Sequence, residues 1–214
     1  MDEYDIEKEI THQRNPVRII NLTDAVFAII MTLLVLEIKI PEEPPHSIQA
    51  LLSAYGIKIV AYIMSFSVTA VYWMSHKLIF SNVKKINTTV LWLNIVYLMI
   101  ASLIPFVAGL IGTFPFEKNS LIFYATILTL LATLRLIMYT YVTSKKELLY
   151  SYVSVKIRGK IIKSMALAAL SFFGSIFIAI SYPKTAFILC AFTPILFMIL
   201  VTIVSRHTTK ENPS

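Results

Sequence analysis

Two ionisable side chains inside hydrophobic segments, Asp24 and His76, are the groups in this sequence best placed to do chemistry. An enzyme site needs several convergent nucleophiles, bases or metal ligands, and no further candidate accompanies these two. The single cysteine, Cys190, lies in an apolar stretch and is expected to be inert packing. Glycine-rich phosphate loops, paired zinc-binding cysteines and a nucleophile elbow are absent from the sequence. We therefore expect no enzyme and no cofactor, and we expect both polar groups to be structural.

The composition explains why so few polar groups are available. Of the 214 residues, 57% are hydrophobic and 14% are charged, whereas about 25% of an average soluble domain is charged. Such a chain lacks the polar surface of a soluble protein, and it is too hydrophobic to be disordered. The composition predicts an all-α membrane protein whose main surroundings are the lipid bilayer.

Six segments are long and apolar enough to cross a bilayer, since a helical span needs about 20 such residues. They are residues 19–40, 48–74, 89–111, 121–142, 162–182 and 185–204. The longest connection, 143–161, is basic and contains LLYSYVSVKI, an amphipathic stretch suited to the membrane interface. We predict a six-helix domain over 18–205, with an N-terminal segment (1–17) and a C-terminal tail (206–214) in the cytoplasm.

The charge distribution predicts the orientation. The net charge is +7, with 19 Lys and Arg against 12 Asp and Glu. With the N-terminus inside, 14 of the basic residues fall in cytoplasmic segments, 3 fall outside, and Lys58 and Arg135 fall within spans. Because basic residues collect in cytoplasmic loops, both termini are expected in the cytoplasm. The positive excess therefore indicates orientation and does not indicate a nucleic-acid partner.

The first span contains an acidic residue, Asp24, close to its start. An ionisable group near membrane depth is costly and usually has a partner or contact with water. Two interpretations stay open. Asp24 bonds to another helix, or it caps the first helix after a short non-helical entry.

An apolar stripe follows Asp24 along the same segment. Ile29, Leu33 and Leu36 recur at i, i+4 and i+7 and share one helical face, with Thr32 beside them. Periodicity alone favours an ordinary packing or lipid-facing stripe, which is the commonest fate of such a pattern.

The second and third spans carry further polar groups. Trp73 and His76 are three residues apart at the end of the second span, and Asn94 lies near the start of the third. In the predicted topology, the end of the second span and the starts of the first and third spans all lie at the cytoplasmic face of the membrane. We therefore predict a polar network at the inner leaflet, made of Arg18, Thr23, Asp24, Trp73, His76 and Asn94. The alternative is that Trp73 is an ordinary interfacial residue and His76 is solvated.

The motifs on these spans resemble those of the transmembrane protein 175 family of potassium channels. In that family an arginine, three further residues and an aromatic–Ser–Asp triplet open the first helix, and this chain has Arg18 followed by Leu22, Thr23 and Asp24. The continuation AVFAIIMTLLVLEIKIP, the YWMSH of the second span, and LWLN with IPF in the third are also similar to bacterial members. The resemblance covers about the first 110 residues, and it departs from the family where Leu replaces the aromatic residue and Thr replaces Ser.

The resemblance implies a homotetramer in the bacterial plasma membrane, with one six-helix unit per chain. The first helix would line a central pore without the TVGYG filter, and Ile29 would form an apolar constriction with Leu33 and Leu36 further out. Thr32 matches the pore threonine linked to selectivity, and the polar network matches the family's inner one. The implied function is passive, potassium-preferring conduction, with K+ bound only transiently in the pore.

Other functions remain as alternatives. An ion-coupled secondary transporter normally has helices broken by Gly or Pro near the midplane. This chain has five glycines, and only Pro105 and Pro194 interrupt its spans. A proton-leak pathway, a membrane enzyme and a non-conducting scaffold are the further alternatives. Near the outer mouth, Glu37 is expected to concentrate cations, whereas Glu42 and Glu43 fit a solvated loop equally well.

Overall fold

The computed structural model describes residues 15–39, 47–151 and 154–195, and its named elements within these ranges are all helices. In chain order they are α2 (Pro16–Leu33), the 3-10 helix η1 (Leu34–Glu37), α3 (Ile48–Phe80), α4 (Thr88–Ala101), α5 (Ile104–Thr113), α6 (Lys118–Ser144), the 3-10 helix η2 (Lys146–Leu148) and α7 (Val155–Ser181). A further apolar helix, Pro183–Ile195, follows α7.

Five helical segments of the described chain are long and apolar enough to cross a membrane. They are Pro16–Glu37, Ile48–Phe80, Thr88–Thr113, Lys118–Ser144 and Val155–Ser181. The helix Pro183–Ile195 begins the sixth predicted span, and the rest of that span, 196–204, lies outside the described residues. The prediction of an all-α, multi-pass membrane fold is confirmed.

Capping side chains move two helix starts from their predicted positions. The first helix begins at Pro16, where the Asn15 side chain accepts a hydrogen bond from the Val17 amide at 3.0 Å. The fifth span begins at Val155, ahead of the predicted 162, because the Ser154 hydroxyl accepts from the Ile157 amide at 3.3 Å. Each cap satisfies an amide that the first helical turn leaves without a partner.

The third span is two helices in series. It breaks between α4 and α5 at Ser102 and Leu103, just before Pro105. Proline has no amide hydrogen to donate to the preceding turn, so a continuous helix cannot form here. The Ser102 hydroxyl donates to the Met99 carbonyl at 2.8 Å, which satisfies one of the carbonyls freed at the end of α4.

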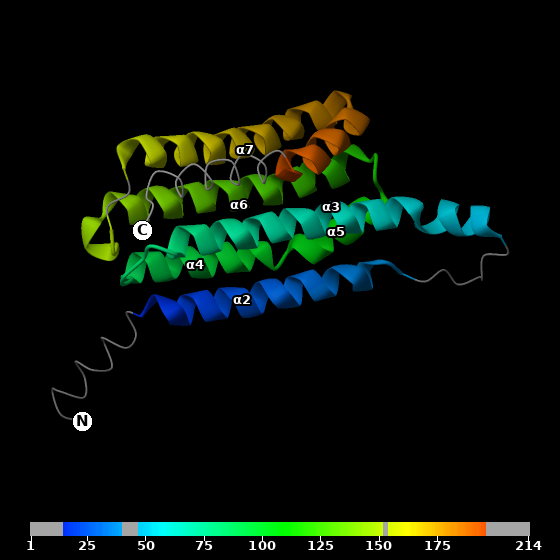
Figure 1. Ribbon diagram of the computed structural model, residues 1–214. Helices are drawn as coiled ribbons and strands as arrows, with labels where there is room; N and C mark the ends of the chain where they lie inside the picture. Colours follow the sequence, from blue (N-terminus) through cyan, green and yellow to red (C-terminus); the bar gives the residue numbers. More distant parts are fainter. Residues whose placement is uncertain (1–14, 40–46, 152–153, 196–214) are drawn as a thin grey trace, which may run out of the picture.

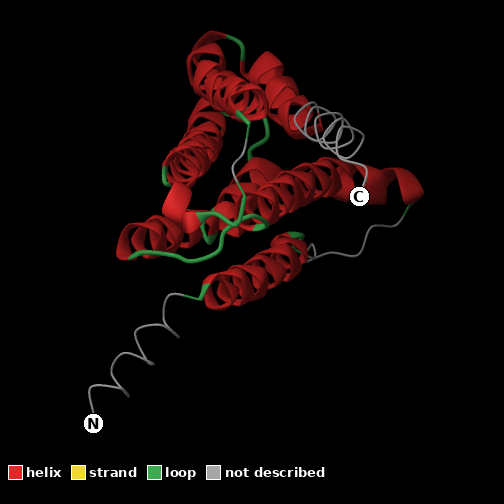
Figure 2. Cartoon of the chain, turned by 60° about the vertical axis from the view of Figure 1, so that its left-hand side comes forward, coloured by secondary structure: helices red, strands yellow, loops and turns green. Residues whose placement is uncertain are grey.

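The helices form a bundle with α2 on one side and α7 on the other (Figure 1). Helix α2 packs on α3, α4 and α5, while α7 packs on α6. Figure 2 shows α2 beside the rest of the bundle rather than inside it. One face of α2 is therefore left without cover from the described part of this chain.

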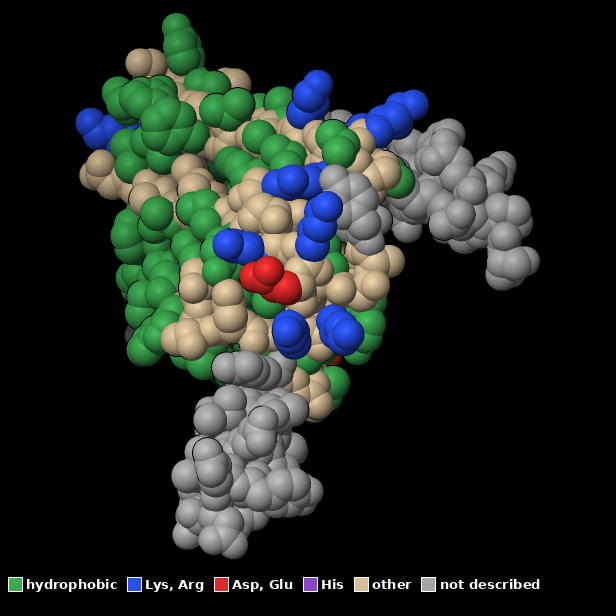
Figure 3. All heavy atoms as spheres, turned by 90° about the vertical axis from the view of Figure 1, so that its left-hand side faces the viewer, with side chains coloured by type: hydrophobic (Ala, Val, Ile, Leu, Met, Phe, Trp, Pro, Cys, Tyr) green, Lys and Arg blue, Asp and Glu red, His purple; other side chains and the backbone are tan. Residues whose placement is uncertain are grey.

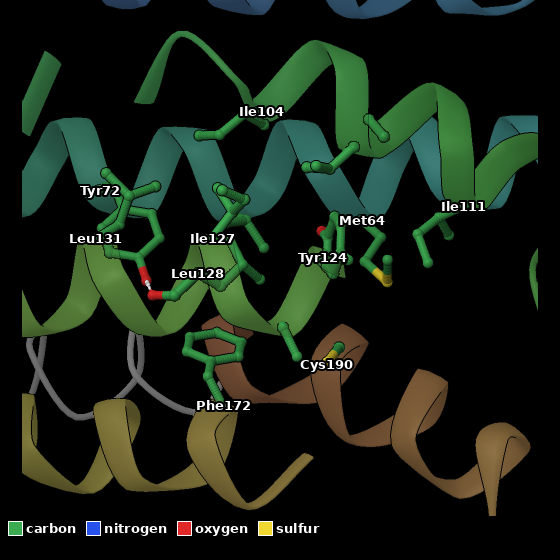
Figure 4. Close-up of a cluster of buried hydrophobic side chains, with 14 of the residues drawn as sticks. Met64, Tyr72, Ile104, Ile111, Tyr124, Ile127, Leu128, Leu131, Phe172 and Cys190 are labelled. Carbon is green, nitrogen blue, oxygen red and sulfur yellow. Dashed lines mark hydrogen bonds between the residues drawn. The ribbon is translucent and has the colours of Figure 1, made fainter. Parts of the chain in front are cut away.

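A buried cluster joins the central helices to α7. Tyr72 of α3 donates from its hydroxyl to the Leu128 carbonyl of α6 at 2.9 Å, and Phe172 of α7 packs into the same cluster. Figure 4 shows these side chains converging between the helices, with Cys190 at the edge of the group. Cys190 is a buried free thiol, as expected for inert packing.

Lys58, which the sequence places within a span, lies near one end of the bundle. The backbone of Lys58 is beside Gly112, close to the end of α5, since a Cβ built on Gly112 would come 3.8 Å from the Lys58 Cα. The first turns of α3 project beyond the other helices (Figure 1). Lys58 is therefore level with a helix end, where its side chain can reach the interface.

At the opposite end, two connections pair with each other. Val83, after α3, forms an antiparallel bridge with Leu149, after α6, and the Tyr150 amide donates to the Asn82 carbonyl at 3.0 Å. Leu148 and Leu149 are buried against the bundle. The first residues of LLYSYVSVKI therefore pack on the protein, and the location of this stretch at the membrane interface stays a prediction.

The same end carries a concentration of cations, and we call it the basic end. Figure 3 shows Lys and Arg side chains spread over this face, with few acidic ones among them. Its lysines and arginine from the two connections and the start of α7 are Lys84, Lys85, Lys145, Lys146, Lys156, Arg158 and Lys160. The start of α2 and the end of α3 lie at this end too (Figure 1).

Candidate functional site

Helix α2 has one buried face and one uncovered face. The buried side chains of the helix and of η1 recur at helical spacing: Ile19, Thr23, Phe27, Ile30 and Leu34. On the other side Ile29 is 57% exposed, Leu33 42% and Leu36 68%. The structure thus places the three apolar residues of the predicted constriction on the surface of α2 that faces away from its own bundle.

The end of this stripe has its own geometry. After Leu33 the α-helix continues as the 3-10 helix η1. In a 3-10 helix, residues three apart lie directly above one another. Leu33 and Leu36 therefore lie in line across this junction. Thr32 is exposed, and its hydroxyl donates to the Ile29 carbonyl at 2.8 Å. A ring of such side chains around an axis would make a narrow, mostly apolar neck.

A buried polar network joins α2 to α3 and α4. The Asn94 amide nitrogen donates to the Thr23 hydroxyl at 3.2 Å, and the Asn94 oxygen lies 2.8 Å from His76 Nε2. Because an amide oxygen only accepts, Nε2 of His76 carries the proton in this bond. All three residues are buried, so their hydrogen bonds hold three helices together where water cannot compete.

Asp24 bonds to the second span. The Trp73 indole nitrogen donates to Asp24 Oδ1 at 2.7 Å, and the Lys77 ammonium lies 4.6 Å from the centre of the Trp73 ring. Asp24 does not cap the helix, because Asn15 is the N-cap and Asp24 lies well inside α2. Of the two open interpretations, the interhelical bond is the one observed.

His76 is packed between aromatic rings rather than solvated. The Phe80 ring stacks on it with centroids 4.4 Å apart, and the Tyr97 ring lies 5.9 Å away at a small interplanar angle. The Nδ1 atom of His76 is buried and has no hydrogen-bond partner. These contacts fix the ring plane and so aim Nε2 at Asn94.

Arg18 does not join the network. It is exposed in the first turns of α2, and its side chain forms no hydrogen bond or ion pair within the described ranges. Its position is on the uncovered face, one turn before Leu22 and in line with Ile29. The structure thus brings together five of the six predicted members, and Arg18 lies instead on the same face as the constriction residues.

Arg135 extends the polar contacts into α6. It is 1% exposed, it donates from Nη1 to the Ser75 hydroxyl at 3.1 Å, and its guanidinium carbon lies 5.0 Å from the Tyr72 ring centre. Ser75 directly precedes His76, so α3 carries polar contacts to α4 and to α6 at one level. The sequence shows that Arg135 lies within a span, but no sequence pattern predicts Ser75 as its hydrogen-bond partner.

At the other end of α2, Glu37 lies against α5. Its carboxylate occupies the space above Gly109, where any Cβ would collide with it. Glycine is therefore required for this close approach. Glu42 and Glu43, the other acidic residues considered near this end, lie outside the described residues.

The described ranges contain no candidate metal site. No group of three His, Cys, Asp or Glu side chains there could hold a metal ion.

Replacing Trp73 by Phe is expected to lower the free energy of unfolding by about 1–2 kcal/mol, because a hydrogen bond to a charged acceptor is lost. Asp24 is only half-buried, so water replaces part of the bond. Thermal unfolding in detergent measures the change. The chain has two tryptophans, and Trp92→Phe is the matched control since Trp92 is 61% exposed. Equal midpoints for both variants would contradict a stabilising Trp73–Asp24 bond.

The first half of the chain is similar to known proteins. A family model described as "Endosomal/lysosomal potassium channel TMEM175" matches residues 18–105. A protein named as a potassium channel in Chryseobacterium sp. (strain P1-3) is 40% identical over 103 residues, which are 48% of this chain and 52% of the relative. A protein of Danio rerio named as an endosomal/lysosomal proton channel is 34% identical over 103 residues, 46% of this chain and 19% of the relative. The chain thus spans about half the length of the bacterial relative and less of the animal one.

The fold has a counterpart among solved structures. The crystal structure of a TMEM175 homologue from Chamaesiphon minutus, described as a lysosomal potassium-selective channel, superposes with a TM-score of 0.72. The match covers 85% of this chain and 95% of that one at 24% identity, so it supports the fold beyond the segment that the family model matches. The matched family consists of ion channels and not enzymes, in agreement with the sequence prediction. Residues 18–105 of the chain are therefore similar to the TMEM175 family.

Proposed function

We propose that the chain is a potassium channel subunit that conducts passively through a pore lined by α2. The observation that carries this proposal is the uncovered face of α2, where Ile29, Leu33 and Leu36 lie 42–68% exposed on a helix whose other face is packed. The potassium channels named among the relatives match this same segment.

The proposed assembly is a homotetramer. Four copies of α2 around a four-fold axis would cover the exposed stripe of each subunit and form a closed ring. At the level of Ile29 the four side chains would make an apolar neck, and such necks gate by loss of water. Selectivity would then come from the width of the neck and partial dehydration of the ion, with Thr32 next to the constriction.

The proposed orientation places the basic end in the cytoplasm. Basic residues are retained on the cytoplasmic side during insertion, and the basic end holds the connections richest in lysine. The bilayer would be the plasma membrane of a bacterium, with both termini inside. Residues 18–205 would form the channel domain between a cytoplasmic N-terminal segment (1–17) and tail (206–214).

The polar network is proposed to hold α2 in place during gating. Thr23 and Asp24 of α2 bond to Asn94 and Trp73 of the neighbouring helices. Opening the neck needs α2 to rotate or tilt outward, and these bonds resist that movement.

The test is potassium flux into liposomes that contain the purified chain. We expect flux down a potassium gradient without ATP and without any other ion gradient, because the proposed pore is passive. The control is vesicles without protein, and the mass of the detergent-solubilised complex tests the tetramer separately. Flux that strictly requires a sodium or proton gradient would overturn the channel proposal in favour of a coupled transporter.

A proton pathway is the second candidate function. Relatives from animals that match the same segment are named as proton channels, including one at 34% identity. The same liposomes distinguish the two candidates. Acidification of the vesicles without a potassium current would assign proton conduction to this chain.

A further inference from the structure

An arginine at the basic end reaches from α7 across to α6. Arg158 donates from Nη2 to the Thr140 carbonyl at 3.4 Å, and its backbone amide donates to the Ser154 carbonyl at 2.9 Å in the first turn of α7. The Nε atom of Arg158 is buried and has no hydrogen-bond partner. No ion pair joins Arg158 to a carboxylate within the described ranges.

A second buried donor without a partner is on the residue next to Thr140. Tyr139, the residue before Thr140 on α6, is 4% exposed, and its hydroxyl is buried with no hydrogen-bond partner. The carbonyl to which Arg158 donates belongs to Thr140, the residue next to Tyr139 on α6. Buried polar groups are nearly always paired, so two unpaired donors on contacting segments of α6 and α7 favour an acceptor that this chain does not supply.

The depth of these groups matches the headgroup layer of a membrane. Helix α6 has 27 residues, which at about 1.5 Å per residue makes a length of roughly 40 Å. The hydrocarbon core is about 30 Å thick, so about one helical turn projects at each end. Tyr139 lies a little more than one turn from the end of α6 at Ser144, and Arg158 lies one turn into α7. Both donors are therefore near the boundary where lipid phosphates begin.

The charge around the pair favours an anion. Lys156 and Lys160 are exposed on α7 on either side of Arg158 in the sequence, and they belong to the basic end shown in Figure 3. A guanidinium group and a hydroxyl can each donate to phosphate oxygens, and such charge-assisted bonds are strong near the low dielectric of the membrane. Clusters of basic residues beside a membrane span are typical of sites for anionic lipids.

We propose that Arg158 and Tyr139 form a site for the phosphate of an anionic phospholipid headgroup, at the basic end between α6 and α7. Arg158 Nε and the Tyr139 hydroxyl donate to the phosphate oxygens, and the exposed lysines of the basic end attract the headgroup. This site is separate from the α2 stripe and does not depend on the conducting function of the chain.

The test is the thermal unfolding of the purified full chain in detergent, with phosphatidylglycerol or phosphatidylcholine added. For the unaltered chain, we expect phosphatidylglycerol at a hundredfold excess over its dissociation constant to raise the midpoint by roughly 5–10 °C above that in phosphatidylcholine. In Tyr139→Phe, which removes a single oxygen, and in Arg158→Gln, most of this difference should disappear. Lys118→Gln is the matched control, since it removes an exposed charge from the opposite end of α6 and should keep the difference.

Three results of the unfolding experiment would overturn the proposal. The first is a midpoint that does not distinguish the two lipids, and the second is an equal loss in Lys118→Gln, which would indicate general surface attraction. The third is an equal rise with inorganic phosphate alone, which would assign the site to a soluble anion rather than to a lipid. Native mass spectrometry of the folded variants counts retained phosphatidylglycerol, and unchanged retention in Tyr139→Phe would also contradict the proposal.

Discussion

Substituting Ile29 by Asn is expected to raise potassium flux by about tenfold, which corresponds to a barrier lower by roughly 1.4 kcal/mol. Ile29 is 57% exposed on the uncovered face of α2, and the proposed neck is closed by the exclusion of water from apolar side chains. An amide at each of four positions gives water hydrogen-bond partners and keeps the neck wet. Liposome flux under a potassium gradient measures the change.

Ile180→Asn is the control for this prediction. Ile180, on α7, is also 57% exposed, so the substitution matches in residue type and exposure but lies away from α2. We expect unchanged flux from it. A well-folded Ile29→Asn tetramer with unchanged flux would remove Ile29 from the constriction.

Replacing Asn94 by Ala is expected to have the largest effect on stability. The substitution leaves Thr23 and His76 without their shared partner in a buried site, and each orphaned group costs about 1–3 kcal/mol. A total of about 2–4 kcal/mol lowers the unfolding midpoint by roughly 5–15 °C in a chain of this size. Thermal unfolding in detergent measures this shift, and we also expect altered gating, because α2 is less firmly held.

Ser102→Ala provides the comparison. The Ser102 hydroxyl donates to a carbonyl of α4, the helix that it directly follows, and the residue is exposed, so its loss should change the midpoint little. If Asn94→Ala unfolds at the same temperature as Ser102→Ala and conducts normally, the network is dispensable for both stability and gating.

Helices and apolar stripes could be predicted because they depend on local pattern. The length and hydropathy of each segment determine whether it can span a bilayer, and the spacing of Ile29, Leu33 and Leu36 determines that they share a face. The helix ends were less predictable. Ser154 sets the start of α7 through a capping hydrogen bond, and Pro105 breaks the third span because it lacks an amide hydrogen. Hydropathy does not detect such single hydrogen bonds.

Side-chain partners depended on contacts between distant parts of the chain. Asn94 and Thr23 are 71 residues apart and Trp73 and Asp24 are 49 apart, so no spacing rule along one helix connects them. The matching ends of three spans, at one side of the membrane, predicted that these polar groups would be near one another. The same reasoning predicted that Arg18 belongs to the network. Arg18 lies instead on the opposite face of α2, because the angular position of a residue around the helix axis, and not only its depth, determines which residues it contacts.

The amino-acid sequence was thus sufficient for the class of protein, the spans, the expected orientation and the stripe on the first helix, since these follow from hydrophobicity and periodicity. Tertiary structure alone decided that α2 packs at the side of the bundle, that Asp24 bonds to Trp73, and that Arg135 bonds to Ser75. Hydrophobicity drives helices into a membrane without selecting neighbours. The selection comes from close packing and from the need of each buried polar atom for a partner, and both are properties of the assembled bundle.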